Sequence, residues 1–256
     1  MSDSLWTLVT AWQHTAAWTL VIAAPITILV LVFISAPYGR HGRGGWGPTV
    51  PGRPAWILME SPTVLGFAVI FWAGGAGSSA AWLLMLLWML HYVHRTFIFP
   101  FRLRSTRPMP LVVASMAFAF QLINITANAT WIATPGHYPD AWLLDPRAGL
   151  GAALFLLGLG INLHADTVLI HLRKPGETGY RIPRGGLYRW ITCPNYFGEI
   201  LIWLGWACAT WSLAGLGFAL YTIANLAPRA ITHHRWYLDR FSDYPPERRA
   251  LIPLIL

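Results

Sequence analysis

Apolar segments about as long as a bilayer is thick recur along the whole chain, and this feature constrains the fold more than any other. They lie at about residues 15–36, 56–75, 79–101, 109–133, 148–171, 195–211 and 212–232. Only helices and closed barrels satisfy backbone polar groups in hydrocarbon, and these segments are too long and too continuously apolar for barrel strands. The sequence therefore predicts an all-α integral membrane protein, with residues 1–256 forming a single domain of about seven transmembrane helices.

Basic residues gather on one side of this predicted bundle when the seven helices are threaded in order. They fall in the first, third and fifth connections and after the last helix, and only Arg147 is left for the opposite face. By the positive-inside rule the arginine-rich face is cytoplasmic, the N-terminus is outside and the C-terminus is inside. This topology suits a bacterial inner membrane or the endoplasmic reticulum membrane.

The basic residues are almost all arginine, with 17 Arg to a single Lys. A guanidinium group suits bidentate phosphate recognition better than an ammonium group does. Two other interpretations stay open at this point, namely attraction to anionic lipid and an arginine-rich genome.

Three of the predicted helices carry polar side chains four residues apart near their cytoplasmic ends, a spacing that places each set on one helix face. These sets are Asn162 and Asp166 in the fifth helix, Asn195 and Glu199 in the sixth, and Arg229, His233 and Tyr237 in the seventh. Unpaired ionisable groups are costly in a membrane, so we expect a shared polar chamber. The alternative is a salt-bridge network that only holds the helices together.

The connection at residues 171–190, "HLRKPGETGYRIPRGGLYRW", lies directly above these polar sets in the predicted bundle. Glycine turns in it let backbone amides approach a ligand closely, and aromatic rings alternate with the cations. This composition suits an aromatic heterocycle that carries phosphates. We expect no nucleic-acid partner, because the connection is short and tied to the membrane at both ends.

A second group of polar residues lies in the earlier helices. Glu60 begins or precedes the second helix, and Tyr92 lies in the third. A carboxyl group in an apolar pocket can donate a proton, and a phenol can hydrogen-bond to a carbonyl oxygen; taken alone, Tyr92 also suits an interfacial anchor. Gln121, Asn124 and Asn128 form a polar stripe in the fourth helix, which we interpret as interhelical hydrogen bonding.

The C-terminal half of the chain closely resembles the steroid 5α-reductases. The resemblance is carried by "LRKPGETGYRIPRGGLYRWITCPNYFGEILIWLGWACATWSLAG" and "PRAITHHRWYLDRFSDYPPERRALIP", and "HYVHRTF" and "YPDAWLLDPRAGLG" extend it through the middle of the chain. The first 55 residues or so resemble the family only in being apolar and then basic. The resemblance implies a membrane reductase that moves hydride from NADPH to C5 of a 3-oxo-Δ4-steroid. It also implies that residues 1–108 lie mainly on the substrate side and residues 146–256 mainly on the NADPH side.

Carried over residue by residue, the resemblance implies a role for each of several side chains. The cofactor-binding positions are Asn162, Asp166, Arg173, Tyr180, Arg181, Asn195, Glu199, Arg229, His233 and Tyr237. Glu60 and Tyr92 match the catalytic pair that holds the steroid 3-carbonyl, and Trp203 matches a ring at the junction of steroid and nicotinamide. Met59 is also expected to contact the substrate, at a position where the family usually has Gln. We expect a monomer with a steroid or sterol-like lipid as substrate, surrounded by membrane lipid, and no metal ion.

Three alternatives stay open. A reductase of the same fold could act on a polyprenol or an enoyl thioester. A membrane methyltransferase of the isoprenylcysteine type also has a cytosolic cofactor pocket, but its cofactor carries no phosphate, so the many arginines would lack a purpose. A transporter would need polar groups near the midplane with access from both sides, whereas the predicted polar sets cluster at one end.

Overall fold

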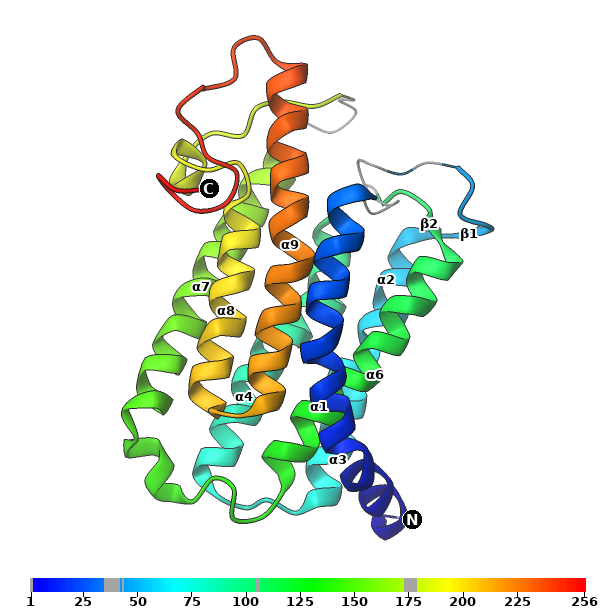
Figure 1. Ribbon diagram of the computed structural model, residues 1–256, viewed down its shortest axis with the longest axis vertical. Coiled ribbons are helices and arrows are strands. Elements are labelled where there is room, and N and C mark those ends of the chain that lie inside the picture. Colours follow the sequence, from blue (N-terminus) through cyan, green and yellow to red (C-terminus); the bar gives the residue numbers. More distant parts are fainter. Residues whose placement is uncertain (1, 35–41, 43, 105, 173–178) are drawn as a thin grey trace.

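A computed structural model describes residues 2–34, 42, 44–104, 106–172 and 179–256, which form an all-helical bundle (Figure 1). Within these residues, seven long helical rods run alternately up and down. The rods are α1 (Ser2–Phe33); α2 (Gly52–Ser61), η2 (Pro62–Gly66) and α3 (Phe67–Gly74); α4 (Ser79–Val93), η3 (His94–Ile98) and α5 (Phe99–Arg102); α6 (Leu111–Ala133); α7 (Pro146–His171); α8 (Pro194–Thr210); and α9 (Leu213–Arg240). The prediction of about seven helices is confirmed.

Short elements complete the fold. Strands β1 (Thr49–Val50) and β2 (Met109–Pro110) pair antiparallel, with Thr49 opposite Pro110, and tie the start of the second rod to the start of α6. Two 3₁₀ turns, η4 (Asp140–Leu144) and η5 (Gly186–Arg189), precede α7 and α8. These elements lie outside the long rods, at the two ends of the bundle.

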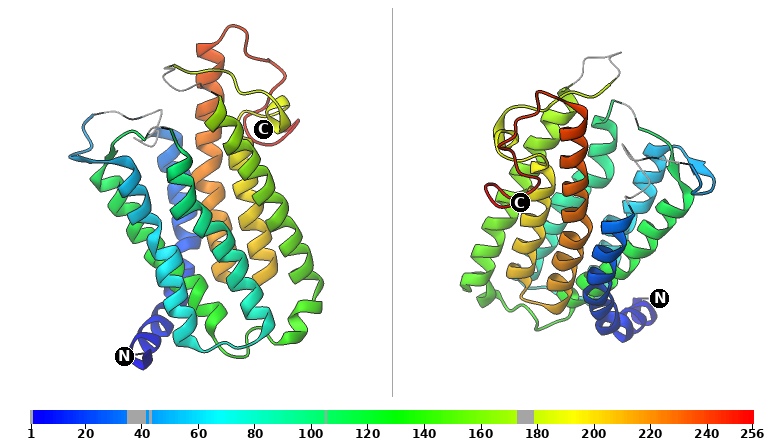
Figure 2. Two further views of the ribbon diagram at one scale, coloured as in Figure 1. Left: turned by 180° about the vertical axis from the view of Figure 1, so that it is seen from behind. Right: turned by 45° about the horizontal axis from the view of Figure 1, so that its top comes forward.

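Two predicted helix starts are wrong, because the apolar pattern reports burial in lipid and not helix length. The first helix begins at Ser2 and not near residue 15, since the intervening residues contain no proline. The second begins at Gly52, where the polar Arg53 hid the start, so Glu60 lies two turns inside the helix. The last helix continues beyond the apolar segment to Arg240 and includes Tyr237, as predicted; its polar final turns project beyond the other rods (Figures 1 and 2).

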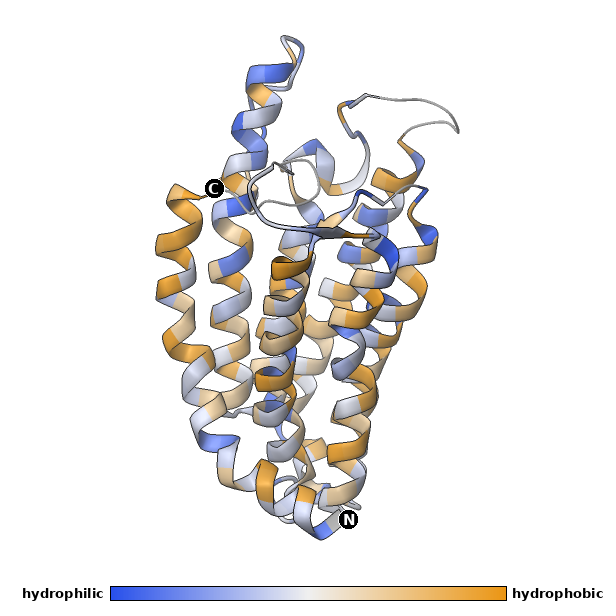
Figure 3. Ribbon diagram, turned by 90° about the vertical axis from the view of Figure 1, so that its right-hand side faces the viewer, coloured by the Kyte–Doolittle hydropathy of each residue, from blue (hydrophilic) through white to orange (hydrophobic). Residues whose placement is uncertain are grey.

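Five of the described helical rods are long and apolar enough to cross a membrane. They are Asp3–Phe33, Gly52–Gly74, Ser79–Arg102, Leu111–Ala133 and Pro146–His171. The helix α8 has 17 residues, and α9 combines an apolar first half with a polar second half. Figure 3 shows hydrophobic residues along the outer faces of the rods and hydrophilic ones near the upper end of α9.

Glycines bring α7 and α8 into backbone contact. A Cβ atom added at Gly158 would lie 2.6 Å from the carbonyl oxygen of Gly198, and one at Gly205 would lie 2.5 Å from the amide nitrogen of Phe155. Small residues at a helix interface allow this kind of close approach in membranes, where lipid removes the usual hydrophobic drive for association. The contact sets the distance between the polar side chains of the two helices.

A cluster of aromatic rings occupies the centre of the bundle. Trp88 of α4 and Trp203 and Trp206 of α8 are each at most 1% exposed. The Trp88 ring centroid lies 5.4 Å from that of Trp203 and 5.1 Å from that of Trp206. These contacts pack α4 against α8 at the centre of the bundle.

Candidate active site

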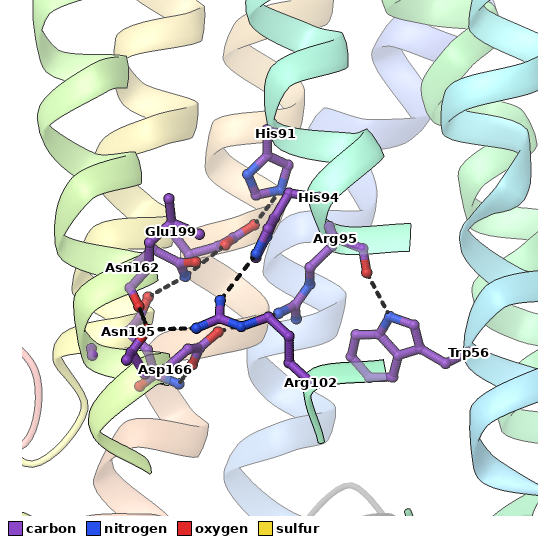
Figure 4. Close-up of polar contacts among 12 residues, drawn as sticks. Trp56, His91, His94, Arg95, Arg102, Asn162, Asp166, Asn195 and Glu199 are labelled. Carbon is purple, nitrogen blue, oxygen red and sulfur yellow. Dashed lines mark hydrogen bonds and ion pairs between the residues drawn. The ribbon is translucent and has the colours of Figure 1, made fainter. Parts of the chain in front are cut away.

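The carboxylate of Glu199 in α8 collects hydrogen bonds from three helices (Figure 4). Its Oε1 atom lies 3.2 Å from Nε2 of His91 in α4 and accepts the indole N–H of Trp203 at 3.0 Å. Its Oε2 atom accepts from the Asn162 amide of α7 at 3.1 Å. Both carboxylate oxygens are therefore satisfied by fixed side chains.

A second carboxylate, Asp166, lies one turn along α7 from Asn162. Its Oδ1 atom accepts from the Asn195 amide at 3.1 Å, and its Oδ2 atom lies 3.9 Å from Nη1 of Arg95. Asn162 also donates to the backbone oxygen of Asn195 at 3.0 Å. The predicted fifth- and sixth-helix sets do meet, and His91, Arg95, Asn162, Asp166, Asn195, Glu199 and Trp203 are called the Glu199 cluster below.

The predicted set on α9 faces α8 through Tyr196. The Tyr196 hydroxyl lies 3.1 Å from Nε2 of His233, and the Arg229 guanidinium lies over the Tyr196 ring at 5.4 Å. Tyr237 is buried and stacks on Tyr244 of the C-terminal segment, with ring centroids 5.2 Å apart. Tyr196 directly follows Asn195 in the chain but was not among the residues predicted from the sequence.

The loop that precedes α8 covers the upper ends of α7 and α9. Tyr180 packs edge-on against Trp236 with ring centroids 4.8 Å apart, and Arg181 is exposed. Gly186 has a φ of +50°, and a Cβ atom there would meet the His164 ring at 2.5 Å, so the turn lies directly on α7. Arg173, also predicted as a cofactor contact, lies outside the described residues.

A second group of polar residues comes from the first half of the chain. It consists of Glu60, Tyr92 and Gln121 and is called the Glu60 site below. Glu60 is 9% exposed, and the Oε2 atom of its carboxyl group accepts from the Gln121 amide of α6 at 2.8 Å. The buried Tyr92 side chain lies close enough to Glu60 and Gln121 to interact with both. Met59 packs with Ala55 and other apolar residues near β2, so its predicted contact with substrate stays a prediction.

Tyr92 connects this site to the Glu199 cluster. Its ring centroid lies 5.5 Å from that of Trp203, and the ring of His91 lies 5.0 Å from the same indole. Trp203 in turn donates to Glu199. The Glu60 site therefore adjoins the Glu199 cluster through direct ring contacts of Tyr92 with His91 and Trp203.

Each of the two candidate catalytic residues is followed by a π-helical turn. In the rod of Glu60, the amide of Phe67 donates to the carbonyl of Pro62 and not to that of Thr63, its usual α-helical acceptor. The Thr63 carbonyl instead accepts the indole N–H of Trp88 at 2.8 Å. In the rod of Tyr92, the amide of Phe99 donates to the carbonyl of His94 and not to that of Arg95. The Arg95 carbonyl instead accepts the indole N–H of Trp56 at 3.1 Å (Figure 4).

These two bonds are reciprocal, because each rod supplies an indole to the π-turn of the other. Such π-turns occur often at functional sites, and a buried carbonyl left without a donor would be costly. The pair of bonds fixes the rod of Glu60 against the rod of Tyr92. The sequence offered no signal for either turn beyond Pro62, which lacks an N–H group.

Arg102 is one of the basic residues near the third connection, which were interpreted from the sequence as topology signals, yet its side chain contacts α7. Its guanidinium donates to the Thr167 hydroxyl of α7 at 2.6 Å and lies 3.2 Å from the His94 ring nitrogen. This contact joins the third rod to α7 directly above Asp166. The third rod thus supplies His91, Arg95 and Arg102 to the same polar region.

Comparison with known proteins assigns a family to this arrangement. The profile described as 3-oxo-5-alpha-steroid 4-dehydrogenase matches residues 107–256. Similar proteins include the steroid 5-alpha-reductase DET2 of Gossypium hirsutum, which is 45% identical over 252 residues, or 94% of this chain and 96% of that protein. The 3-oxo-5-alpha-steroid 4-dehydrogenase 1 of Bos taurus is 40% identical over 90% of this chain and 92% of its own. The Homo sapiens protein of the same name is 41% identical over 85% of each chain. Each of these three proteins matches at least 85% of this chain, and the chain belongs to the steroid 5-alpha-reductase family.

Proposed function

We propose that this protein is a membrane-bound, NADPH-dependent 3-oxo-Δ4-steroid 5α-reductase. The similar proteins are named for this activity. The observation that carries the proposal is the placement of two buried groups, the Glu60 carboxyl and the Tyr92 phenol, beside the Glu199 cluster, where the Tyr92 ring centroid lies 5.5 Å from that of Trp203. This arrangement suits a reaction in which a carbonyl is polarised at one end and hydride arrives at the other.

The Glu60 site is suited to the charge that this reaction creates. An enone conjugates C5 to the C3 carbonyl, so a hydride added at C5 moves negative charge onto the C3 oxygen. Donors fixed at that oxygen stabilise the transition state more than the ground state. Tyr92 supplies a hydroxyl, and Glu60 supplies a protonated or proton-sharing carboxyl; protonation at C4 then gives the saturated ketone.

The residues around Glu199 and above it fit a dinucleotide chemically. Bound NADPH would supply the hydride to the substrate. Asn162, Asn195 and Glu199 offer the amide and carboxylate groups that pair with a carboxamide and with ribose hydroxyls. Arg181 and Arg229 offer guanidinium groups for phosphates, and Arg173 remains a proposed contact of the same kind. Asp166, Tyr180, His233 and Tyr237 complete the proposed cofactor side.

The membrane location suits both reactants. The arginine-rich end would face the cytoplasm, in a bacterial inner membrane or the endoplasmic reticulum, where NADPH arrives from water. A steroid dissolves in lipid and can enter between helices. A groove of about 330 Å³ lies between α1 and α6, lined by residues that include Trp12, Thr15, Leu122 and Thr126, and supports an entry path on this side.

The direct test is incubation of the purified protein with NADPH and a 3-oxo-Δ4-steroid, followed by mass analysis of the product. We expect a gain of two hydrogens and a 5α configuration at C5. A polyprenol and an enoyl thioester, offered in parallel, should remain unreduced. Reduction of either one, with the steroid untouched, would overturn the proposal in favour of a related reductase.

Two variants test the assigned roles. Tyr92→Phe and Glu60→Gln should each lower kcat about 100-fold, because each removes a donor at the developing oxyanion. NADPH affinity, measured by fluorescence titration, should stay within about twofold, since neither side chain belongs to the Glu199 cluster. Loss of NADPH binding by either folded variant would contradict the assignment.

A further inference from the structure

Four hydrogen bonds connect the central indole Trp206 to Glu60 through three amide side chains of α6. Trp206 donates to Oδ1 of Asn128 at 2.9 Å, and the Asn128 amide donates to Oδ1 of Asn124 at 3.0 Å. The Asn124 amide donates to Oε1 of Gln121 at 3.2 Å, and the Gln121 amide donates to Oε2 of Glu60 at 2.8 Å. The polar stripe predicted from the sequence is thus a continuous amide chain with Glu60 at its end.

The direction of this chain is fixed by its first member. An indole N–H can donate but cannot accept, so the Asn128 side chain must present its oxygen to Trp206. Its NH₂ group then faces Asn124, and the same sense follows for Asn124 and Gln121. If any one amide were turned around, two N–H groups or two oxygens would face each other in a buried site. The group presented to Glu60 is therefore an N–H donor.

The chain is shielded from water along its length. Trp206 and Asn124 are 0% exposed, Asn128 is 1% exposed and Gln121 is 8% exposed. In such surroundings aligned hydrogen bonds polarise one another, and an unpaired amide is expensive. The orientation of the last N–H is accordingly held more firmly than that of an isolated glutamine.

We infer that Gln121 is a positioning residue for Glu60, and that it selects which carboxyl oxygen carries the shared proton. An N–H donor at Oε2 makes that oxygen an acceptor in every state, so the proton of a protonated Glu60 lies on Oε1. Among the described residues, no hydrogen bond to Oε1 is present, which leaves it to donate to the substrate carbonyl. The amide chain thus orients the acid whether or not substrate is bound.

This inference rests on the proposed reductase function, and one variant tests it directly. Gln121→Leu keeps the size of the side chain but removes the N–H group. We expect kcat for a 3-oxo-Δ4-steroid to fall about tenfold, the value of one hydrogen bond to a charged or reacting group. The KM values for steroid and NADPH should change less than about threefold, because no contact with either is lost.

The decisive measurement is the same substitution in a second background. If Gln121 acts through Glu60, adding Gln121→Leu to Glu60→Gln should lower single-turnover rates by less than about twofold further. A merely structural role would lower the rate by the same factor in both backgrounds. Met116→Leu is the control on α6, since this side chain is 65% exposed on the outside of the helix and lines neither the Glu60 site nor the groove between α1 and α6; it should leave kcat unchanged.

Two further variants keep the test informative if Gln121→Leu fails to fold. Gln121→Glu has the same shape but, when ionised, offers Glu60 no donor, so kcat should fall at least as far. Trp206→Phe removes the indole N–H that sets the direction of the amide chain, so the three amides can turn around together. It should lower kcat about three- to fivefold, less than loss of the Gln121 donor itself.

The outcomes separate the two proposals. A wild-type protein that does not reduce the steroid with NADPH would overturn the proposed function. An active wild-type protein whose Gln121→Leu and Gln121→Glu variants keep kcat within twofold would overturn the positioning role alone. A rise in steroid KM with unchanged kcat would likewise overturn it, because it would make Gln121 a binding contact.

Discussion

The Glu199 cluster and the Glu60 site each hold a carboxyl group inside the membrane, but they satisfy it differently. Glu199 receives three N–H groups, one each from α4, α7 and α8, on both of its oxygens. Glu60 receives one N–H group, from an amide chain that lies on a single helix, on one oxygen. The first carboxylate is enclosed by several elements, whereas the second keeps an oxygen without a partner among the described residues.

This difference indicates different roles for the two carboxyl groups. A carboxylate whose charge is balanced by fixed groups is suited to holding a ligand in one orientation. A carboxyl group with one oxygen anchored and the other available is suited to sharing a proton with a substrate. Changes in the Glu199 cluster should therefore act on NADPH affinity, and changes in the Glu60 site on turnover.

The largest effect should come from separating α7 and α8 at the glycine contact. A Cβ atom at Gly198 would lie 2.6 Å from the Asn162 amide nitrogen and 2.7 Å from the Gly158 carbonyl oxygen. Because backbone atoms on both sides cannot give way, Gly198→Ala should cost about 3 kcal/mol of stability and loosen the contact of Asn162 with Glu199. Thermal unfolding and NADPH titration would measure both effects.

The matched control for this change is Gly160→Ala on α7, where an added Cβ atom meets no other atom within 4 Å. It should leave NADPH affinity unchanged and should stabilise the helix by about 0.5–1 kcal/mol, since alanine loses less backbone entropy than glycine. Equal effects of the two substitutions would mean that the glycine contact does not position Asn162.

Removing the charge of Glu199 should give the next largest effect. Glu199→Gln keeps the shape but turns one oxygen into an NH₂ group that must face His91, Trp203 or Asn162, each of which now donates to it. Breaking a buried network in this way typically costs about 3 kcal/mol, so we expect NADPH to bind about 100-fold more weakly. At saturating NADPH the turnover should remain above that of Glu60→Gln. The reverse order would break the proposed division between the two regions.

The sequence allowed the framework of both regions to be predicted but not their connections. Apolar length located the rods, and a spacing of four residues correctly grouped Asn162 with Asp166 and Asn195 with Glu199. A spacing shows which residues share a face, but it does not show which helix lies opposite. For that reason the sequence did not indicate that Gln121 contacts Glu60.

The π-turns and the third rod illustrate the same limit. A π-turn changes the hydrogen-bond partner of one or two amides and leaves the hydropathy pattern almost intact, so neither turn could be anticipated. His91, Arg95 and Arg102 enter the Glu199 cluster or its surroundings from a rod that was assigned to the substrate side. Tertiary packing, and not local sequence, determines that contribution.

Two indoles one turn apart on α8 allow the Glu199 cluster and the Glu60 site to be tested by matched substitutions. Trp203 donates to Glu199, and Trp206 donates to Asn128 at the head of the amide chain. Trp203→Phe removes one of three donors from Glu199, so NADPH affinity should fall about tenfold. The Trp206→Phe variant should leave that affinity unchanged and lower kcat instead. Parallel loss of affinity in both variants would indicate a general loosening of the aromatic core.

The smallest effect should come from a substitution at Asp145, at the far end of α7. It tests whether kcat and NADPH affinity depend on the stability of the whole protein. Asp145 caps this helix by accepting the Arg147 amide at 2.8 Å, and it also pairs with the Arg147 side chain at 2.7 Å. Those hydrogen bonds hold the pKa of Asp145 at about 2, below its ordinary 3.8, so their contribution is complete at neutral pH and is lost as the pH falls toward 2.

Asp145→Ala removes the cap, whereas Asp145→Asn keeps an oxygen for the amide and removes only the charge. At pH 7 the alanine variant should unfold at a slightly lower temperature, with the asparagine variant between it and the wild type. Neither kcat nor NADPH affinity should change, since Asp145 lies at the opposite end of the helix from Asn162 and Asp166. A loss of NADPH affinity in the alanine variant would mean that the Glu199 cluster is held by the stability of the whole helix and not by the local α7–α8 contact.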